Sequence, residues 1–314
     1  MGPPPRSPRT DRATATVVLL AGVLAISWAA IFVRLAGEAP ALTIAAVRVA
    51  VGAAVVVTAA TWWGRRQGAA FSWRGSAGWY LAGGIVLTGH FWSWFASLER
   101  TSVGSSVMII GLQPLLASAM AYLWLAERPT QWELIGMALA AVGLAIVGAR
   151  DFEAGGEAFQ GDALALLGAV LGAAYRTIGR AARPRMGALE YSAGVYTVGA
   201  LLLWALVWAS DVQVSGFSLA TWGWLLALAL VSQVVGHTAM NWALGTFRVA
   251  TVSLVAQAEP VLATLLAVPV LGERIGGGVA VGGPFIVGGV LLALAKSSTD
   301  GAAERGARTA PPLR

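Results

Sequence analysis

The chain has no cysteine, and only 11% of its residues are charged. Without cysteine there is no disulfide, no thiolate nucleophile and no cysteine-ligated metal site. A soluble domain carries about 25% charged residues, so this chain has too few to cover a surface that faces water. Instead, 57% of its 314 residues are hydrophobic, and its mean hydropathy is +0.72. These residues come in long apolar runs, which indicates a membrane protein.

Several motifs that carry chemistry are absent as well. The sequence has no G-x-x-x-x-G-K-[ST] phosphate-binding loop, which excludes ATP-driven pumping by this chain alone. It has neither an H-E-x-x-H metalloprotease motif nor a G-x-S-x-G serine motif. The formal net charge is +6, but the basic residues lie between apolar runs, where membrane topology explains them better than nucleic-acid binding does. We expect no cofactor and no nucleic-acid partner.

Ten apolar runs predict ten membrane-spanning helices, because backbone polar groups in a bilayer must be satisfied within the segment. The period-2 alternation of a barrel strand is absent. The sequence therefore predicts an all-α membrane protein, with a tail at residues 1–13 and a polar, disordered tail at residues 297–314. The expected spans are 14–34, 41–63, 77–98, 102–126, 132–149, 161–178, 188–209, 219–244, 249–272 and 276–296.

Residues 89–149 and 236–295 carry the same motifs in the same order. Each repeat holds five spans, an odd number, so the second repeat must enter the membrane upside down relative to the first. Inverted repeats around a central cavity are the usual build of a secondary transporter. We expect repeats at 14–149 and 161–296. The matching residues are Gly89-His90 and Gly236-His237, Pro114 and Pro260, Glu127-Arg128 and Glu273-Arg274, Gly136 and Gly282, and Gly143 and Gly289.

Basic residues fix the expected orientation. Sixteen Arg and Lys residues fall on the side of the N-terminus and four on the other side, which predicts that both termini are cytoplasmic. Arg176 is counted on the cytoplasmic side, because the sixth run ends at residue 178. Arg34 and Arg48 are expected to snorkel to head groups at the outer ends of their spans, and gating pairs of these two arginines with Glu38 or Glu99 stay open.

The repeated block identifies a family resemblance. The segments LQPLLASAMAYLWLAERPTQWELIGMALAAVGLAIVG (112–148) and AEPVLATLLAVPVLGERIGGGVAVGGPFIVGGVLLA (258–293) resemble the EamA-type members of the drug/metabolite transporter superfamily. Within the first repeat, GHFWSWFASLERTSVGSSVMIIGLQPLLA (89–117) is similar to bacterial exporters of aromatic amino acids. The resemblance implies ten helices around a central cavity, in an exporter of small metabolites at the bacterial inner membrane.

The eighth span carries Gln233, His237 and Asn241 at a spacing of four, hence on one helix face. Such a stripe can hydrogen-bond the amino and carboxylate groups of a zwitterion. The alternative is that these side chains join packed helices.

The third span carries His90, Trp94 and Ser97 near one face. His90 is the repeat partner of His237, so both imidazoles are expected to line the central cavity. Trp94 is placed to stack on an aromatic ring or cap an ammonium group; the alternative is a residue that faces lipid. Two histidines without carboxylates or cysteines fall short of a metal site.

The fourth and ninth spans carry Pro114 and Pro260, which are expected to kink the helices and act as hinges. Polar residues precede them, and further candidates for substrate binding lie on the same helices: Ser106, Gln113, Ser253 and Gln257. Glu259 is the acidic residue deep in a span, and a buried carboxyl is a plausible proton carrier. The alternative is a hydrogen-bonded carboxyl that holds the kinked helix against a neighbour.

These features predict a non-enzymatic secondary transporter that exports a neutral or zwitterionic metabolite, such as an aromatic or other amino acid, by alternating access. One alternative is a proton-coupled drug/metabolite antiporter that uses Glu259. Another is a membrane-embedded enzyme with His90 and His237 as acid and base. Nucleotide sugars and organic phosphates are disfavoured, because no Arg or Lys is expected at a span centre. The sequence gives no indication of the oligomeric state.

Overall fold

The computed structural model describes residues 12–66, 75–98, 100–101, 103–148 and 156–309. In this part of the chain every regular element is a helix. The elements are α1 (Arg12–Ser27), α2 (Ala29–Leu35), α3 (Ala41–Arg66), α4 (Ala77–Leu98), α5 (Val103–Ile110), α6 (Gln113–Leu125), α7 (Gln131–Gly148), α8 (Gly156–Ala182), α9 (Ala188–Ala209), α10 (Leu219–Ala227), the π-helix η1 (Leu228–His237), α11 (Thr238–Ala243), α12 (Val249–Ala256), α13 (Glu259–Leu271) and α14 (Gly277–Thr309).

These helices fill the ten predicted spans and confirm an all-α membrane protein. Four spans consist of consecutive helices: α1–α2, α5–α6, α10–η1–α11 and α12–α13. Eight segments of the described chain are long and apolar enough to cross a membrane, and α7 is a shorter apolar helix. The remaining span, the third in chain order, is α4 with 22 residues, and its Gly, Trp and His residues make it less apolar. The sixth span is longer than expected, since α8 continues four residues past 178, to Ala182.

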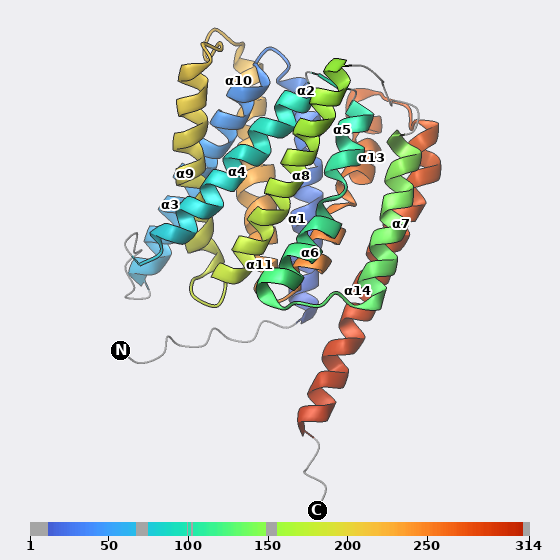
Figure 1. Ribbon diagram of the computed structural model, residues 1–314. Helices are drawn as coiled ribbons and strands as arrows, with labels where there is room; N and C mark the ends of the chain where they lie inside the picture. Colours follow the sequence, from blue (N-terminus) through green and yellow to red (C-terminus); the bar gives the residue numbers. More distant parts are fainter. Residues whose placement is uncertain (1–11, 67–74, 99, 102, 149–155, 310–314) are drawn as a thin grey trace, which may run out of the picture.

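The two repeats run in opposite directions through the bundle. In Figure 1, α1 rises from the lower face while its counterpart α8 descends from the upper face. The start of α1 and the end of α14 lie at the same lower face, which we name the terminal face; the opposite one is the distal face. The inverted architecture predicted from the sequence is thereby confirmed. The predicted tails lie partly outside the described residues, and α14 continues as a helix to Thr309.

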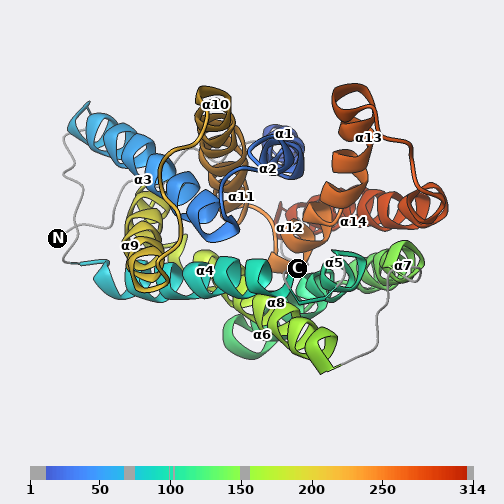
Figure 2. The same ribbon diagram turned by 90° about the horizontal axis from the view of Figure 1, so that it is seen from above.

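Helices of one repeat pack mainly against helices of the other. α1 lies against η1 and α11, and the equivalent helix α8 lies against α4. α3 pairs with its counterpart α9 at one end of the bundle, and α7 pairs with its counterpart α14 at the other end (Figure 2). Large buried side chains, including Tyr80, Phe91, Tyr191 and Tyr196, fill the space around α3, α4 and α9. The repeats are interlocked and share one core.

Four repeat-matched glycines join α7 to α14. A methyl group added at Gly136 would lie 2.6 Å from the carbonyl oxygen of Gly289, and one added at Gly143 would lie 2.5 Å from that of Gly282. The pairing is crosswise, because Gly136 corresponds to Gly282 and Gly143 to Gly289. Such a pattern requires a pseudo-two-fold axis between the two helices, and the missing side chains let the backbones touch.

The two prolines begin new helices where kinks were expected. The fourth span breaks at Gly111 and Leu112, and Pro114 lies in the first turn of α6. The ninth span breaks at Gln257 and Ala258, and Pro260 lies in the first turn of α13. Proline is tolerated there because the first turn has no intrahelical partner for its missing N–H. Each repeat therefore contains a helix break at mid-span directly before a proline.

Candidate functional site

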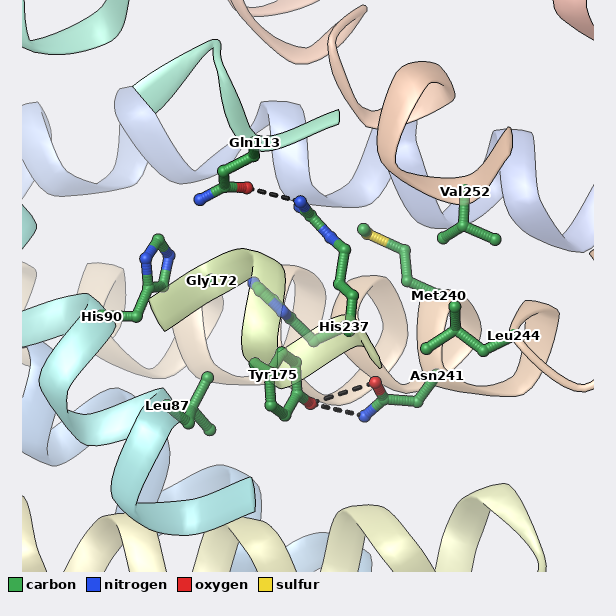
Figure 3. A pocket seen from close by; sticks show the side chains of 11 residues that line it. Leu87, His90, Gln113, Gly172, Tyr175, His237, Met240, Asn241, Leu244 and Val252 are labelled. Carbon is green, nitrogen blue, oxygen red and sulfur yellow. Dashed lines mark hydrogen bonds between the residues drawn. The ribbon is translucent and has the colours of Figure 1, made fainter. Parts of the chain in front are cut away.

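A small cavity lies between the repeats near the helix breaks. Its volume is about 20 Å³, which is room for about one water molecule. The first repeat contributes α4 and α6 to the wall, and the second contributes α8, η1, α11 and α12. The side chains in Figure 3 are those of Leu87, His90, Gln113, Gly172, Tyr175, Arg176, His237, Met240, Asn241, Leu244 and Val252. The sequence did not single out the apolar residues of this wall, nor did it single out Tyr175 or Arg176 as cavity residues.

Both histidines line this cavity, as their positions in the repeat suggest. The Nδ1 atom of His90 lies 2.8 Å from the carbonyl oxygen of Gly168. Since a carbonyl only accepts hydrogen bonds, Nδ1 carries the proton and Nε2 is left as the ring's other polar atom. The ring of Phe91 lies edge-on to His237, with 6.0 Å between the ring centroids. One imidazole from each repeat therefore reaches the same space.

The polar stripe of the eighth span is divided between the cavity and helix packing. Asn241 lines the cavity, but its amide nitrogen donates to Tyr175 at 2.7 Å and to Ser192 at 3.0 Å. Gln233 is fully buried outside the cavity wall, and its Oε1 accepts a 2.8 Å hydrogen bond from Arg48 Nε. The stripe starts in η1, and π-helical segments are frequent at functional sites.

Three candidates on the third and fourth spans lie outside the cavity wall. The hydroxyls of Ser97 and Ser106 are 2.7 Å apart and join α4 to α5. Trp94 stacks on His90, with ring centroids 6.2 Å apart, and on Phe95 at 5.3 Å. It therefore holds the imidazole of His90 from behind, and the two serines hold helices together.

The ninth-span candidates lie at the helix break. Gln257 Nε2 donates to the carbonyl oxygen of Gly111, and these two residues are repeat partners, 146 positions apart. The broken helices of the two repeats therefore meet at the pseudo-two-fold axis. Ser253 is buried, and its hydroxyl has no hydrogen-bond partner among the described residues. Neither side chain lines the cavity.

Two arginines, the buried Arg48 and the half-buried Arg176, correct the sequence interpretation. Arg176 lines the cavity, and its Nη1 donates to Gln113 Oε1 at 2.5 Å. Arg48 is 4% exposed, and its guanidinium lies 4.8 Å from the centroid of the Phe91 ring. The snorkelling predicted for Arg48 is wrong, because an amide and an aromatic face compensate its burial. The cytoplasmic position predicted for Arg176 is wrong as well, because α8 extends past it to Ala182.

Glu259, the first residue of α13, belongs to the same charged group. The charges of Arg48 and Arg176 influence the carboxyl of Glu259. The same two charges influence the imidazoles of His90 and His237. Neither arginine has a carboxylate oxygen within 4.0 Å among the described residues. The argument that disfavoured anionic substrates, the lack of a basic residue at a span centre, therefore no longer holds.

Two ion pairs close the bundle, one at each face. At the distal face, Arg34 in the last turn of α2 pairs with Glu273, which follows α13; we name this pair the distal latch. At the terminal face, Arg180 Nε lies 2.5 Å from Glu127 Oε1; we name it the terminal latch. The residues of each latch stand 146 positions from their counterparts, Arg34 from Arg180 and Glu127 from Glu273. The same contact is thus made twice, once per face.

The terminal latch is the more enclosed of the two. The exposed fractions of its Arg and Glu side chains are 27% and 16%, against 61% and 40% in the distal latch. Arg180 also donates to the carbonyl of Leu244 at 2.7 Å, and Glu127 accepts the backbone N–H of Val249 at 3.2 Å. Glu127 and Glu273 thus each pair with an arginine of the opposite repeat. Of the alternatives for Arg34, Glu99 lies outside the described residues, and Glu38 bonds to the start of α10.

Comparison with known proteins places this fold. The EamA-like transporter family matches residues 14–149 and 159–295, one block per repeat. The chain is 25% identical over 220 residues to the uncharacterized transporter YyaM of Bacillus subtilis (strain 168), a match that covers 68% of this chain and 72% of that protein. Its fold is similar to that of a protein solved by crystallography, with a TM-score of 0.77 and 22% identity over 90% of this chain and 98% of that one. The chain belongs to the EamA-like transporter family.

Proposed function

We propose that this protein exports small metabolites across the bacterial inner membrane by alternating access, with amino acids, aromatic ones included, as the first substrates to test. The observation that carries the proposal is the pair of repeat-related latches on either side of a cavity between the repeats. The family and YyaM support a transporter and leave its substrate open. They also favour a transporter over the alternative of an enzyme with paired histidines.

The closed latches and the small cavity fit an occluded state. A cavity of about 20 Å³ is too small for an amino acid, so binding requires that one face opens. Because the latches are related by the pseudo-two-fold axis, release of either one produces equivalent openings in opposite directions. The excess of basic residues at the terminal face supports the cytoplasmic side for that face.

A flux assay in liposomes tests this proposal. The purified protein is reconstituted, and the flux of labelled Trp, Phe and Thr is measured with and without a proton gradient. We expect flux above that of empty liposomes for at least one of them. If none of the three labelled amino acids gives flux above that of empty liposomes, the amino-acid proposal is rejected.

The latches supply a matched control for that assay. The chain has no cysteine, so the double variant Arg34→Cys, Glu273→Cys can be joined by a bifunctional maleimide without side reactions. Cross-linking across the distal latch should stop the flux, while each single cysteine variant treated in the same way should keep it. Flux that survives the cross-link would contradict alternating access.

Proton coupling through Glu259 is the second candidate, supported by the place of this carboxyl at the mid-span helix break and by the electrostatic influence of Arg48 and Arg176 on it. Glu259→Gln should then transport without dependence on a pH gradient. If wild-type flux is already independent of the gradient, the carboxyl serves only the charge balance of the cavity and the fold of α13.

A further inference from the structure

The charged group around the cavity carries an excess of positive charge. It contains two guanidiniums, Arg48 from the first repeat and Arg176 from the second, and two imidazoles. Glu259 is the one described carboxyl that acts on either arginine. Protonation of the imidazoles or of Glu259 only increases the excess. The cluster therefore holds at least one uncompensated positive charge in the interior of the bundle.

Such a charge is stable in an interior only when a partner of opposite sign reaches it. Among the described residues, Arg176 donates only to the neutral amide oxygen of Gln113. In the same part of the chain, Arg48 contacts only the amide oxygen of Gln233 and the ring face of Phe91 in this way. A guanidinium offers several N–H donors in a fixed fork, whose geometry matches the two oxygens of a carboxylate. Both forks have donors left for an anion.

The helix breaks add positive potential at the same place. Gln113 is the first residue of α6 and lines the cavity, and no side chain caps this helix N-terminus. The N-terminus of α13 carries Glu259 itself. Unpaired backbone N–H groups at a helix N-terminus favour an anion, and broken helices provide such ends at mid-membrane in transporters.

We propose that the transported molecule carries a carboxylate, which binds Arg176 from the cavity side, with Arg48 as the second cation, and competes with Glu259 for them. This proposal deepens the transport function proposed above and rests on it. The carboxylate belongs either to an organic acid or to an amino acid. Because one arginine comes from each repeat, the bound carboxylate holds the two repeats together and favours the occluded state. Without substrate, Glu259 takes the role of the anion.

Binding to the purified protein tests the carboxylate separately from transport. The shift in thermal unfolding midpoint is measured with phenylacetate, L-phenylalanine, phenethylamine and inorganic phosphate. These probes carry a carboxylate, a carboxylate with an ammonium, an ammonium alone, and a different anion. We expect stabilisation by one or both carboxylates and none by phenethylamine. Stabilisation by phenylacetate assigns an organic acid; stabilisation by phenylalanine alone assigns an amino acid. A shift with phosphate alone, or no shift with either carboxylate, overturns the proposal.

Three variants give the assay its controls. Arg176→Gln should weaken carboxylate affinity about 10- to 100-fold, as for a lost charged hydrogen bond, and Arg176→Lys should keep the charge but lose part of the affinity. Glu259→Gln should tighten carboxylate binding, because it removes the competing anion; a merely misfolded variant cannot gain affinity. Arg185→Gln, at an exposed site beyond α8, should change nothing. Unchanged affinity in Arg176→Gln, or weaker affinity in Glu259→Gln, contradicts the assignment.

The binding and flux assays fail in distinguishable ways. Arg176-dependent binding of a carboxylate without any flux would leave the site standing and reject transport. Flux of a molecule without a carboxylate would leave transport standing and reject the site.

Discussion

Two kinds of polar side chain in this bundle differ in how their hydrogen bonds are met. One group has its hydrogen bonds met by neighbouring helices, as Asn241 does through Tyr175 and Ser192. The other group faces the cavity with donors to spare, as Arg176 does. The first group stabilises the fold, since a buried polar atom that loses its partner costs about 1–3 kcal/mol. The second group is free to bind a ligand.

Asn241→Leu should therefore act on stability. The change leaves the hydroxyls of Tyr175 and Ser192 without their amide partner, so we expect a loss of about 1–3 kcal/mol, measured as a lower thermal unfolding midpoint of the purified protein. The double variant Asn241→Leu, Tyr175→Phe should recover part of the loss, because both partners of one hydrogen bond are then removed. If the unfolding midpoint stays unchanged while flux is lost, Asn241 binds the substrate instead.

For single residues, the sequence predicts the positions that the repeat relates to each other, and it misses those that depend on contacts between helices. His90 and His237 could be placed at the cavity because the repeat gives them corresponding depths. Arg176 could not, because hydropathy ends the sixth span at residue 178, and the extra turn of α8 becomes visible only in the structure. Arg48 was misplaced because its compensating contacts, Gln233 and Phe91, lie on other helices.

The helices of this protein depend on close backbone contact at some glycines and not at others. Gly136 of α7 faces the carbonyl of Gly289, whereas Gly288, the preceding residue of α14, has nothing within 4 Å of an added methyl group. The repeat predicts which glycines match, but the crosswise contact depends on where the pseudo-two-fold axis passes. The breaks at Pro114 and Pro260 were likewise predicted in position but not as full interruptions.

Gly136→Ala and Gly288→Ala should therefore have opposite effects. The first change forces α7 away from α14, and overpacking of this kind costs about 1–3 kcal/mol. The second adds a better helix former in open space, which is worth about 0.5–1 kcal/mol of stability. Thermal unfolding of the two purified variants measures both. Equal effects of the two substitutions would show that α7 and α14 do not touch at Gly136.

The connection between α2 and α3 also holds the start of α10. Glu38 Oε2 accepts the backbone N–H of Ser218 at 2.8 Å and the hydroxyl of Thr221 at 2.9 Å. These bonds, that from the Ser218 backbone first, lower the pKa of Glu38 below its ordinary 4.5. The contact therefore contributes its full stability at pH values above 4.5, and this contribution is lost as the pH falls through the lowered pKa of Glu38. The unfolding midpoints of wild type and Glu38→Gln should differ at neutral pH and converge in acid; a difference that persists in acid contradicts this role.

The whole molecule is two interlocked copies of one unit, and its symmetry explains contacts that no local pattern indicates. The odd number of spans per repeat is enough to predict that the copies are inverted. The match of Arg34 with Arg180 at the offset of 146 is also present in the sequence. Without knowledge that the copies contact each other crosswise, however, nothing there pairs Arg34 with Glu273. The latches are a property of the assembled repeats.

The unequal enclosure of the latches predicts which face opens more readily. An exposed ion pair such as Arg34–Glu273 is worth about 0–1 kcal/mol, whereas loss of one partner from an enclosed, hydrogen-bonded pair costs several kcal/mol. Wild type should therefore open more often at the distal face. A single cysteine at the cavity, Leu87→Cys, reports this by its rate of labelling with a membrane-impermeant maleimide from either side of oriented vesicles.

In the Leu87→Cys variant, the further change Glu273→Gln should raise the labelling rate from the distal side by no more than about 5-fold, the equivalent of about 1 kcal/mol. Glu127→Gln should raise labelling from the terminal side by more than about 10-fold, because glutamine has no negative charge and keeps only one of the two oxygens that accept from Arg180 and Val249. Glu157→Gln, an exposed change at the start of α8, is the control and should leave both rates unchanged. If either latch variant raised labelling from both sides, the two faces would not open in alternation, and the symmetric arrangement of the latches would serve stability alone.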